Sequence, residues 1–254
     1  MRAGPLAGRT ALITGASRGI GAATARALAG AGARLALVAR GADALHALAR
    51  ELATIDAAPR AGAAAAPMAH LVVVADCTHA ADVARLAADV TAWAGGPPDI
   101  LVNNAGIYPR ARLHEQDPDE FAATLDANLA APFRVLHAFL AAMRARGSGH
   151  VVSIGTVADR NIWPLNGAYS ASKYGLRALH EVLYAESRGS GVRSTLIAPG
   201  AVDTDLWNTH DAELGKTLTA RERMLRPDDV ARAVLYAVSQ PPHMIVHELR
   251  LSPS

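Results

Sequence analysis

Short β-prone runs alternate with longer helix-forming stretches along the whole chain. The predicted strands are Thr10–Thr14, Arg34–Ala39, His70–Val74, Asp99–Asn103, His150–Ile154, Val192–Ile197 and Met244–Leu251. The predicted helices follow the first strand up to Ala31 and then cover Ala42–Ala57, His79–Ala94, Pro118–Arg146, Asn166–Arg188 and Pro227–Ser239. Strands joined in this way by helices run parallel, and the helices cover both faces of the sheet. The order therefore predicts an α/β fold with a seven-stranded parallel sheet between two helix layers.

No linker or break in composition divides the 254 residues, so we expect a single domain over residues 1–254. Because 51% of the residues are apolar, the chain can bury a large core. Ala57–Ala69 is rich in alanine and proline and is expected to be a surface loop. Thr204–Leu225 also lacks a clear period, and such segments are often lids or binding loops. We expect a substrate lid over about residues 204–225.

Charge and cysteine content exclude several classes of protein. The formal net charge is +2 and the basic residues are scattered, which argues against nucleic-acid and membrane-surface binding. The single cysteine, Cys77, excludes an internal disulfide and fits a reducing compartment. No apolar run is long enough to cross a bilayer, and Met1–Gly8 lacks the apolar core of a signal peptide. A cytoplasmic protein without a metal site is the expectation.

A glycine-rich turn joins the first predicted strand to the first predicted helix. It reads Thr14-Gly15-Ala16-Ser17-Arg18-Gly19-Ile20-Gly21. Glycines allow a tight turn and close backbone approach to a diphosphate, and the helix N-terminus offers free N–H groups. The alternative is an ordinary turn without a ligand. Because a strand precedes the turn and a helix and second strand follow, the pattern favours a dinucleotide-binding, Rossmann-like doubly wound fold.

The residues after the second strand indicate which dinucleotide is bound. An NAD site is expected to have an acidic residue there, for the ribose hydroxyls. This chain has Ala39 and Arg40, and the next acid is Asp43. The guanidinium of Arg40 suits a 2′-phosphate, and Arg18 could reach the same group. We therefore favour NADP(H) over NAD(H); the alternative is that both arginines are simply solvated.

Tyr169 and Lys173 are four residues apart in a predicted helix, so their side chains share one face. A free phenol has a pKa of roughly 10. A neighbouring ammonium group favours the phenolate, so we expect the pKa of Tyr169 to be lowered. Such a pair can exchange a proton with a carbonyl or alcohol oxygen.

Together these motifs make the chain resemble the short-chain dehydrogenase/reductase family, in its small single-domain branch. The matching segments are Thr14 to Gly21, Asp76, Asn103-Asn104-Ala105-Gly106, Tyr169 with Lys173, and Pro199-Gly200-Ala201-Val202-Asp203-Thr204. The resemblance implies that Tyr169 is the acid/base and that Lys173 holds the nicotinamide ribose. With the two arginines, the expected cofactor-binding residues are Gly15, Ser17, Arg18, Gly19, Ile20, Gly21, Arg40, Asp76, Cys77, Asn103, Ala105, Gly106, Tyr169, Lys173, Pro199, Gly200, Val202 and Thr204.

Two further catalytic positions follow from the resemblance. Asn128 matches an asparagine that holds a proton-relay water, and Pro132, which has no N–H, leaves the Asn128 carbonyl without its usual helical partner. The alternative is that Pro132 merely kinks the helix. Thr156, thirteen residues before Tyr169, stands where the family has a serine; it keeps the hydroxyl, and Ser153 is the other candidate. Asp159 replaces a small residue that is common at its position.

The expected substrate pocket and the expected subunit interface both rest on apolar side chains. Tyr108, Val157, Trp163, Leu206 and Trp207 are predicted to line the pocket, which suggests a partly apolar or aromatic carbonyl compound. Either tryptophan could instead belong to the core or to an interface. Phe121–Met143 is apolar nearly all round, whereas a helix on a sheet needs one apolar face. We expect a homo-oligomer, and the resemblance implies a dimer of dimers.

The predicted activity is hydride transfer between NADP(H) and a carbonyl or secondary alcohol, with Tyr169 as general acid/base; a homotetrameric ketoreductase would fit. Two alternatives stay open. One is a non-catalytic NADP(H) sensor or scaffold, favoured only by the changed serine position. The other is an epimerase or dehydratase of the extended branch, which uses a different glycine spacing and a larger C-terminal substrate domain.

Overall fold

All seven strands pair in one parallel sheet in the computed structural model, which describes residues 4–57, 70–207 and 220–254. In chain order the elements are β1 (Thr10–Thr14), α1 (Gly19–Gly30), β2 (Arg34–Ala39), α2 (Ala42–Ala57), β3 (Leu71–Val74), α3 (Ala80–Ala94), β4 (Ile100–Asn103), α4 (Pro118–Leu125), the π-helix η1 (Asp126–Ala130), α5 (Ala131–Arg146), β5 (Gly149–Ile154), the 3₁₀-helix η2 (Val157–Asp159), α6 (Gly167–Glu186), β6 (Val192–Pro199), the 3₁₀-helices η3 (Asp205–Trp207) and η4 (Arg221–Arg223), α8 (Pro227–Val238) and β7 (Glu248–Leu251).

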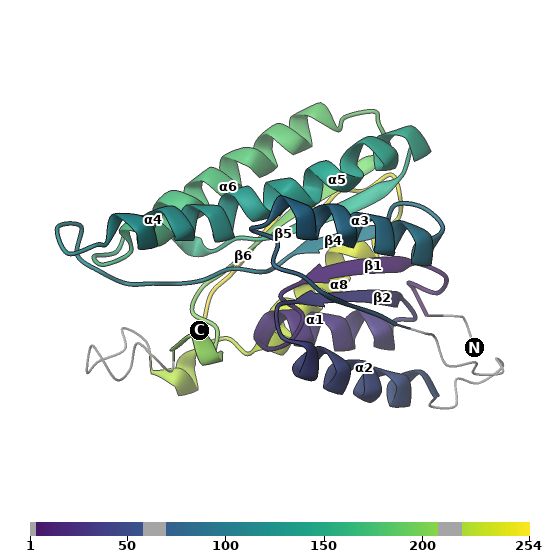
Figure 1. Cartoon of the computed structure of the whole chain (residues 1–254), viewed down its shortest axis with the longest axis horizontal. Coiled ribbons are helices and arrows are strands. Elements are labelled where there is room, and N and C mark those ends of the chain that lie inside the picture. Colours follow the sequence, from purple (N-terminus) through teal and green to yellow (C-terminus); the bar gives the residue numbers. More distant parts are fainter. Residues whose placement is uncertain (1–3, 58–69, 208–219) are drawn as a thin grey trace.

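The strand order across the sheet is β3-β2-β1-β4-β5-β6-β7. Helices α3, α4, α5 and α6 cover one face, and α1, α2 and α8 cover the other (Figure 1). The predicted doubly wound, three-layer fold is confirmed. From β1, strands β2 and β3 are added toward one edge of the sheet, and β4 to β7 are added toward the other edge. The connections therefore leave β1 and β4 in opposite directions, and a crevice opens at the carboxyl ends of these strands, where such folds bind ligands.

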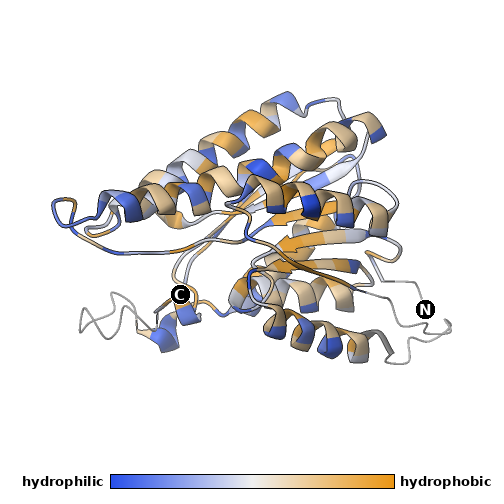
Figure 2. Cartoon of the chain, viewed as in Figure 1, coloured by the Kyte–Doolittle hydropathy of each residue, from blue (hydrophilic) through white to orange (hydrophobic). Residues whose placement is uncertain are grey.

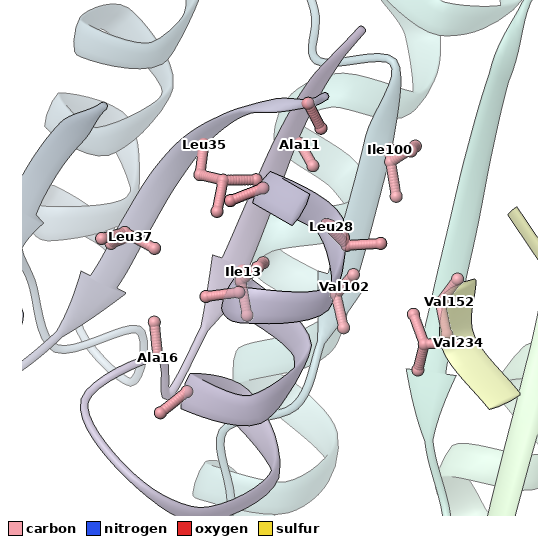
Figure 3. Packing of buried hydrophobic residues seen from close by; sticks show 14 of the residues in the cluster. Ala11, Ile13, Ala16, Leu28, Leu35, Leu37, Ile100, Val102, Val152 and Val234 are labelled. Atoms are coloured by element: carbon pink, nitrogen blue, oxygen red, sulfur yellow. The ribbon is translucent and has the colours of Figure 1, made fainter. Parts of the chain in front are cut away.

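Two closely packed apolar cores hold the layers together. Figure 2 shows the central strands as the most hydrophobic part of the chain, and β1 is buried at all five positions. Leu28 of α1 and Val234 of α8 pack with Ile13 and Leu37 on one face of the sheet (Figure 3). On the other face, α3 and α5 contribute Leu86 and Phe139. A strand that is buried on both faces has a continuous apolar sequence, so these strands could be predicted from the sequence.

Most element boundaries differ from the predicted ones by one or two residues, but two differences are larger. The predicted strand Met244–Leu251 begins only at Glu248, because the Met244 N–H donates to the carbonyl of Pro241 in a turn. The predicted continuous helix Pro118–Arg146 is interrupted by η1 just before Pro132. Most of the predicted lid, residues 208–219, lies outside the described residues.

Candidate active site

A cavity of about 660 Å³ lies at the carboxyl ends of the central strands. It is lined by the following predicted site residues: Gly15, Ser17, Arg18, Gly19, Ile20, Arg40, Asp76, Cys77, Ala105, Gly106, Tyr108, Thr156, Val157, Trp163, Tyr169, Lys173, Pro199, Gly200, Val202, Thr204, Leu206 and Trp207. Three predicted site residues do not line it: Gly21, Asn103 and Asn128. The structure thus brings segments between Gly15 and Trp207 together at one cavity.

The glycine-rich turn is built for close approach of backbone to backbone. Gly15 has a φ of +65°, and a Cβ added there would lie 2.9 Å from the Cα of Ala105. A Cβ on Gly21 would lie 2.2 Å from the carbonyl oxygen of Gly15. Gly21 therefore acts behind the turn, by letting α1 pack against it, and does not face the cavity. Side chains at either position would push the turn open.

Asn104 ties the glycine-rich turn to the end of β4, a role that the sequence did not reveal. Its side-chain amide donates to the carbonyls of Thr14 at 2.9 Å and Gly15 at 3.1 Å. In return, the Thr14 hydroxyl accepts from the backbone N–H groups of Asn104 and Ala105. These bonds hold the two sides of the crevice at a fixed separation. Asn103, by contrast, is buried and donates to the carbonyl of Pro132.

The N-terminus of α1 has the properties of an anion site. No side chain caps this helix, and its first turn contains no acidic residue. The backbone N–H groups of that turn therefore face the cavity lining with the positive end of the helix dipole. A Cβ added at Gly19 would lie 3.3 Å from Cγ2 of Thr204, so a glycine there keeps this end of α1 open to an anion such as a diphosphate.

One basic and one acidic residue, Arg40 and Asp76, line the part of the cavity that lies at the ends of β2 and β3. Arg40 is exposed on the lining, close enough to Asp76 to act on its charge. Burial opposes ionisation of Asp76, but hydrogen bonds from the hydroxyl and N–H of Thr78 hold its pKa below the ordinary value. Burial raises the pKa of the Cys77 thiol to about 11, so the thiol stays protonated at neutral pH. Cys77 is therefore a wall residue and not a nucleophile.

Arg18 does not share a partner with Arg40 in this structure. Its guanidinium lies 3.8 Å from the carboxylate of Asp205 in η3, and both side chains are more than half exposed. An exposed pair of this kind contributes little to stability and can rearrange. It connects the glycine-rich turn to the start of the predicted lid across the mouth of the cavity.

Lys173 is nearly buried, and its ammonium group donates to the carbonyl of Ile154 at 3.0 Å. The nitrogen lies 5.9 Å from the centre of the Tyr169 ring, which shows that one helix face presents both groups. Burial lowers the pKa of Lys173 to about 8, against the opposing charge of Asp159. At pH 7 the side chain therefore remains mostly charged.

Tyr169 lines the cavity, but its pKa is shifted in the direction opposite to our expectation. Burial raises the pKa of the phenol, and the charges of Tyr108 and Asp159 add to the rise. A hydrogen bond with the Thr156 hydroxyl works in the opposite direction and is outweighed. The expected lowering by Lys173 is therefore wrong for this state of the site, because desolvation of the phenolate dominates.

Thr156 takes the place expected for the catalytic hydroxyl. It ends the loop after β5 and caps η2, with its Oγ1 accepting from the N–H of Ala158 at 3.2 Å. Since an oxygen lone pair takes that bond, the hydroxyl hydrogen is left to donate toward Tyr169 or a ligand oxygen. Ser153, the other candidate, is buried within β5 and does not line the cavity.

Asn128 lies in the π-helix and is fully buried. Its side-chain amide holds the loop after β4: Oδ1 accepts from the N–H of Ile107 at 2.8 Å, and Nδ2 donates to the Ile107 carbonyl at 2.9 Å and to Ser172. In η1 the N–H of Ala131 bonds to the carbonyl of Asp126, five residues back. The side chain therefore holds the loop after β4 in place, and the water relay at the backbone carbonyl stays a prediction.

Aromatic side chains form the wall beside Tyr169. The ring of Tyr108 lies 4.5 Å from that of Tyr169 and 5.7 Å from that of Trp207, edge to face in both cases. The Tyr108 hydroxyl donates to Asn166 at 3.0 Å, and the Trp207 indole donates to the Val202 carbonyl at 2.9 Å. Both rings are thus fixed in orientation. Asn166 was not predicted, although a polar residue just before a helix was a usable signal.

Metal clusters and membrane-spanning helices are both absent from the part of the chain that the structure describes. Within it, no group of three or more histidine, cysteine or acidic side chains is arranged to hold a metal ion. The described helices also include none that is both long and apolar enough to span a bilayer.

Known proteins with similar sequences agree with this geometry. The family model described as short chain dehydrogenase matches residues 9–215. The glycine betaine reductase of Emericella nidulans is 38% identical over 253 residues, covering 98% of this chain and 19% of that relative. The chain thus spans about a fifth of the length of that relative. An uncharacterized oxidoreductase of Staphylococcus haemolyticus is 32% identical, with 98% of each chain covered.

Solved structures extend the comparison to three dimensions. A metagenomic short-chain oxidoreductase in complex with NADP is 34% identical with a TM-score of 0.81, covering 98% of this chain and 99% of the other. The alcohol dehydrogenase of Thermococcus sibiricus, complexed with 5-hydroxy-NADP, is 33% identical with a TM-score of 0.82, covering 96% and 95%. With a family match over most of its length, this chain belongs to the short-chain dehydrogenase/reductase family of oxidoreductases.

Proposed function

We propose that the protein is an NADP(H)-dependent oxidoreductase that interconverts a carbonyl compound and a secondary alcohol. The observation that supports this most directly is the convergence of Tyr169, Lys173 and Thr156 on the cavity that the glycine-rich turn also lines. A bound nicotinamide dinucleotide would supply or accept the hydride. Neighbouring structures bound to NADP or 5-hydroxy-NADP favour the phosphorylated cofactor.

The residues that would hold the dinucleotide come from the ends of three strands, β1, β2 and β3, and from helix α6. The glycine-rich turn and the start of α1 suit the diphosphate, and Arg40 suits a 2′-phosphate. Asp76 suits the adenine end, and Lys173 suits the hydroxyls of the nicotinamide ribose. These assignments follow from the place of each residue on the cavity lining and from its charge.

The proton chemistry follows from the charge states of the chain's own groups. Because burial raises the pKa of Tyr169, its phenol keeps its proton at neutral pH and is ready to donate from Oη. Thr156 would donate a hydrogen bond to the same substrate oxygen. The ammonium group of Lys173 would stabilise negative charge that develops there. This arrangement favours reduction at neutral pH, with oxidation requiring alkaline conditions.

Replacing Tyr169 with phenylalanine tests the acid/base assignment. The variant Tyr169→Phe removes only the hydroxyl, so we expect kcat for ketone reduction to fall by about 10²–10⁴-fold while NADPH affinity changes little. Tyr236→Phe is the control, because Tyr236 is an exposed tyrosine on α8 that does not line the cavity. Absorbance of NADPH and fluorescence titration measure the two quantities. Wild-type turnover in Tyr169→Phe would refute the assignment.

A non-catalytic NADP(H) sensor would use the same cavity. The presence of a tyrosine, a buried lysine and a hydroxyl in one cavity argues against that alternative, because binding alone requires none of the proton-transfer groups. An extended-branch epimerase is disfavoured because residues 220–254 supply only η4, α8 and β7, and no separate substrate domain within the described chain.

Arg40 is the residue on which the cofactor preference rests. Arg40→Ala should weaken NADPH binding by about 10- to 100-fold, the loss expected for a charge-assisted hydrogen bond, and leave NADH binding unchanged. Arg50→Ala is the control, since Arg50 is an exposed arginine on α2 that does not line the cavity. Equal losses for the two cofactors would contradict the assignment. A loss in Arg18→Ala alone would transfer the role to Arg18.

We further propose that the substrates include small carbonyl compounds that carry a quaternary ammonium group. One relative is named a glycine betaine reductase, and glycine betaine carries a trimethylammonium group. Three aromatic residues on the lining, Tyr108, Trp163 and Trp207, can attract such a cation through their ring faces. Arg18 and Arg40, the arginines among the described lining residues, belong to the nucleotide side of the cavity.

An isosteric pair of ketones separates charge from shape. Trimethylammonioacetone and 4,4-dimethylpentan-2-one differ by a nitrogen in place of a carbon, and reduction of either gives a secondary alcohol. We expect kcat/KM to favour the cation by about 5- to 30-fold, as cation–π contacts predict. Trp207→Leu should reduce this ratio, whereas Trp93→Leu, which changes a tryptophan outside the lining, should not. Equal kcat/KM values would reject the substrate class and leave the reductase assignment intact.

We also propose that the protein associates through the helices on the α4–α6 face. Phe133, Tyr174 and Val182 on these helices are exposed by 48%, 40% and 53%. Exposed apolar groups on adjacent helices indicate an interface. Light scattering at micromolar concentration should therefore show an oligomer, and Val182→Glu should shift it toward monomer. A monomer in the wild-type protein would contradict the proposal.

A further inference from the structure

Asn166 does not play the usual part of an asparagine at the start of a helix. It immediately precedes α6, where an asparagine side chain normally accepts a hydrogen bond from a backbone N–H of the first turn. Its side chain makes no such bond. Instead, its Oδ1 accepts from the hydroxyl of Tyr108 at 3.0 Å, and the residue lines the cavity. The side chain therefore serves the cavity and not the helix.

The backbone just before Asn166 is held in an unfavourable conformation. In the described part of the chain, Leu165 is the one non-glycine residue with a positive φ, at +72°. Its carbonyl accepts from the N–H of Ala111 at 3.1 Å, and Ala111 pairs with Asn166 in an isolated parallel bridge. These contacts join the segment that follows Tyr108 to the start of α6. Strain of this kind persists where the surrounding structure imposes it, and it is concentrated at functional sites.

The bond with Tyr108 fixes the orientation of the Asn166 amide. Burial raises the pKa of Tyr108, so its phenol is protonated at neutral pH and is the donor in this bond. The amide oxygen is therefore occupied. Asn166 is only 5% exposed, yet its Nδ2 is not enclosed by protein and has no acceptor among the described residues. Because the orientation is already fixed, this nitrogen can donate to a ligand in the cavity at a low entropic cost.

The amide lies one helical turn from the proposed general acid. The N–H of Ser170 donates to the carbonyl of Asn166 at 2.7 Å, so Asn166 belongs to the first turn of α6. Residues three apart on a helix lie on one face, with Cβ atoms about 5–6 Å apart, and Tyr169 is three residues after Asn166. The ring of Tyr108 also lies 4.5 Å from that of Tyr169. A substrate whose carbonyl oxygen meets Tyr169 therefore brings its neighbouring carbons toward Asn166.

We propose that Asn166 is a specificity-determining residue whose Nδ2 donates to an acceptor oxygen one or two carbons from the reacting carbonyl, while Tyr108 holds the amide in that orientation. The substrate class is therefore a ketone with a neighbouring ether, ester or hydroxyl oxygen. The inference rests on the proposed function, because the second oxygen is defined relative to the carbonyl that Tyr169 protonates. It does not depend on a quaternary ammonium group.

Isosteric ketones isolate the contribution of the second oxygen. Methoxyacetone has an ether oxygen where pentan-2-one has a methylene group, and 4-methoxybutan-2-one differs from hexan-2-one in the same way one carbon further out. For each pair the measured quantity is the ratio of kcat/KM for the ether to kcat/KM for the alkyl ketone, at saturating NADPH. The intrinsic reactivity of the ketones is the same for every variant, so a change in this ratio reports a contact with the protein.

Three variants separate the two ends of the amide. Asn166→Ala should lower the ratio of at least one pair by about 3- to 10-fold, the value of one hydrogen bond. Asn166→Asp keeps the acceptor for Tyr108 but removes the donor, so it should lower the ratio at least as much. Tyr108→Phe keeps the ring and releases the amide, so it should have a smaller effect. The control Asn161→Ala changes an exposed asparagine outside the lining and should leave both ratios unchanged.

Asn166→Asp is the deciding variant. Aspartate has nearly the same shape and is itself favoured at a helix start, so this variant is expected to fold even if Asn166→Ala does not. Wild-type ratios in Asn166→Asp would overturn the proposal, because Asn166 would then act only by anchoring Tyr108. Equal losses for both ketones of each pair in Asn166→Ala would overturn it as well, by indicating a purely structural role. Inactivity of the wild type towards every ketone would instead count against the proposed function.

Discussion

The burial of one ammonium group is the constraint on which the active site depends. Lys173 is only 6% exposed, and an unpaired buried charge costs several kcal/mol. The structure compensates with the Ile154 carbonyl, which accepts from the ammonium group at 3.0 Å. Ile154 ends β5, so the same hydrogen bond that satisfies the lysine also anchors α6 to the strand that leads to Thr156. This bond therefore helps to fix the Thr156 hydroxyl relative to α6.

A second constraint comes from the irregular helix on the opposite side of that lysine. Pro132 cannot donate a backbone hydrogen bond, and the chain accommodates this by widening into the π-helix η1. Widening places the side chain of Asn128 against the loop after β4, where a Cβ on Gly106 would lie 2.9 Å from its Oδ1. The loop is held close because Gly106 has no side chain. Asn128 of η1 thus ties the loop after β4 to Ser172 on α6.

Local patterns predicted what depends on local chemistry. Continuous apolar runs predicted the strands. The glycine-rich turn and the Tyr169–Lys173 spacing predicted two parts of the cavity lining. Each of these patterns depends on residues that are close in sequence. The direction of the Tyr169 pKa shift could not be predicted, since it depends on burial by the whole fold. Asn103 was misplaced because adjacent residues at a strand end face opposite ways, and only Asn104 turns toward the cavity.

The pairing of Asp159 with Arg250 was equally out of reach, because the two residues are 91 positions apart. This pair links the turn that carries Thr156 to β7, the last strand in the chain. Without β7, Asp159 would be a buried acid with no described donor, a state that costs several kcal/mol. The pairing of β7 at the sheet edge therefore stabilises the turn that carries Thr156. The edge strand, which contributes nothing to the cavity lining, stabilises the geometry of the residues that do.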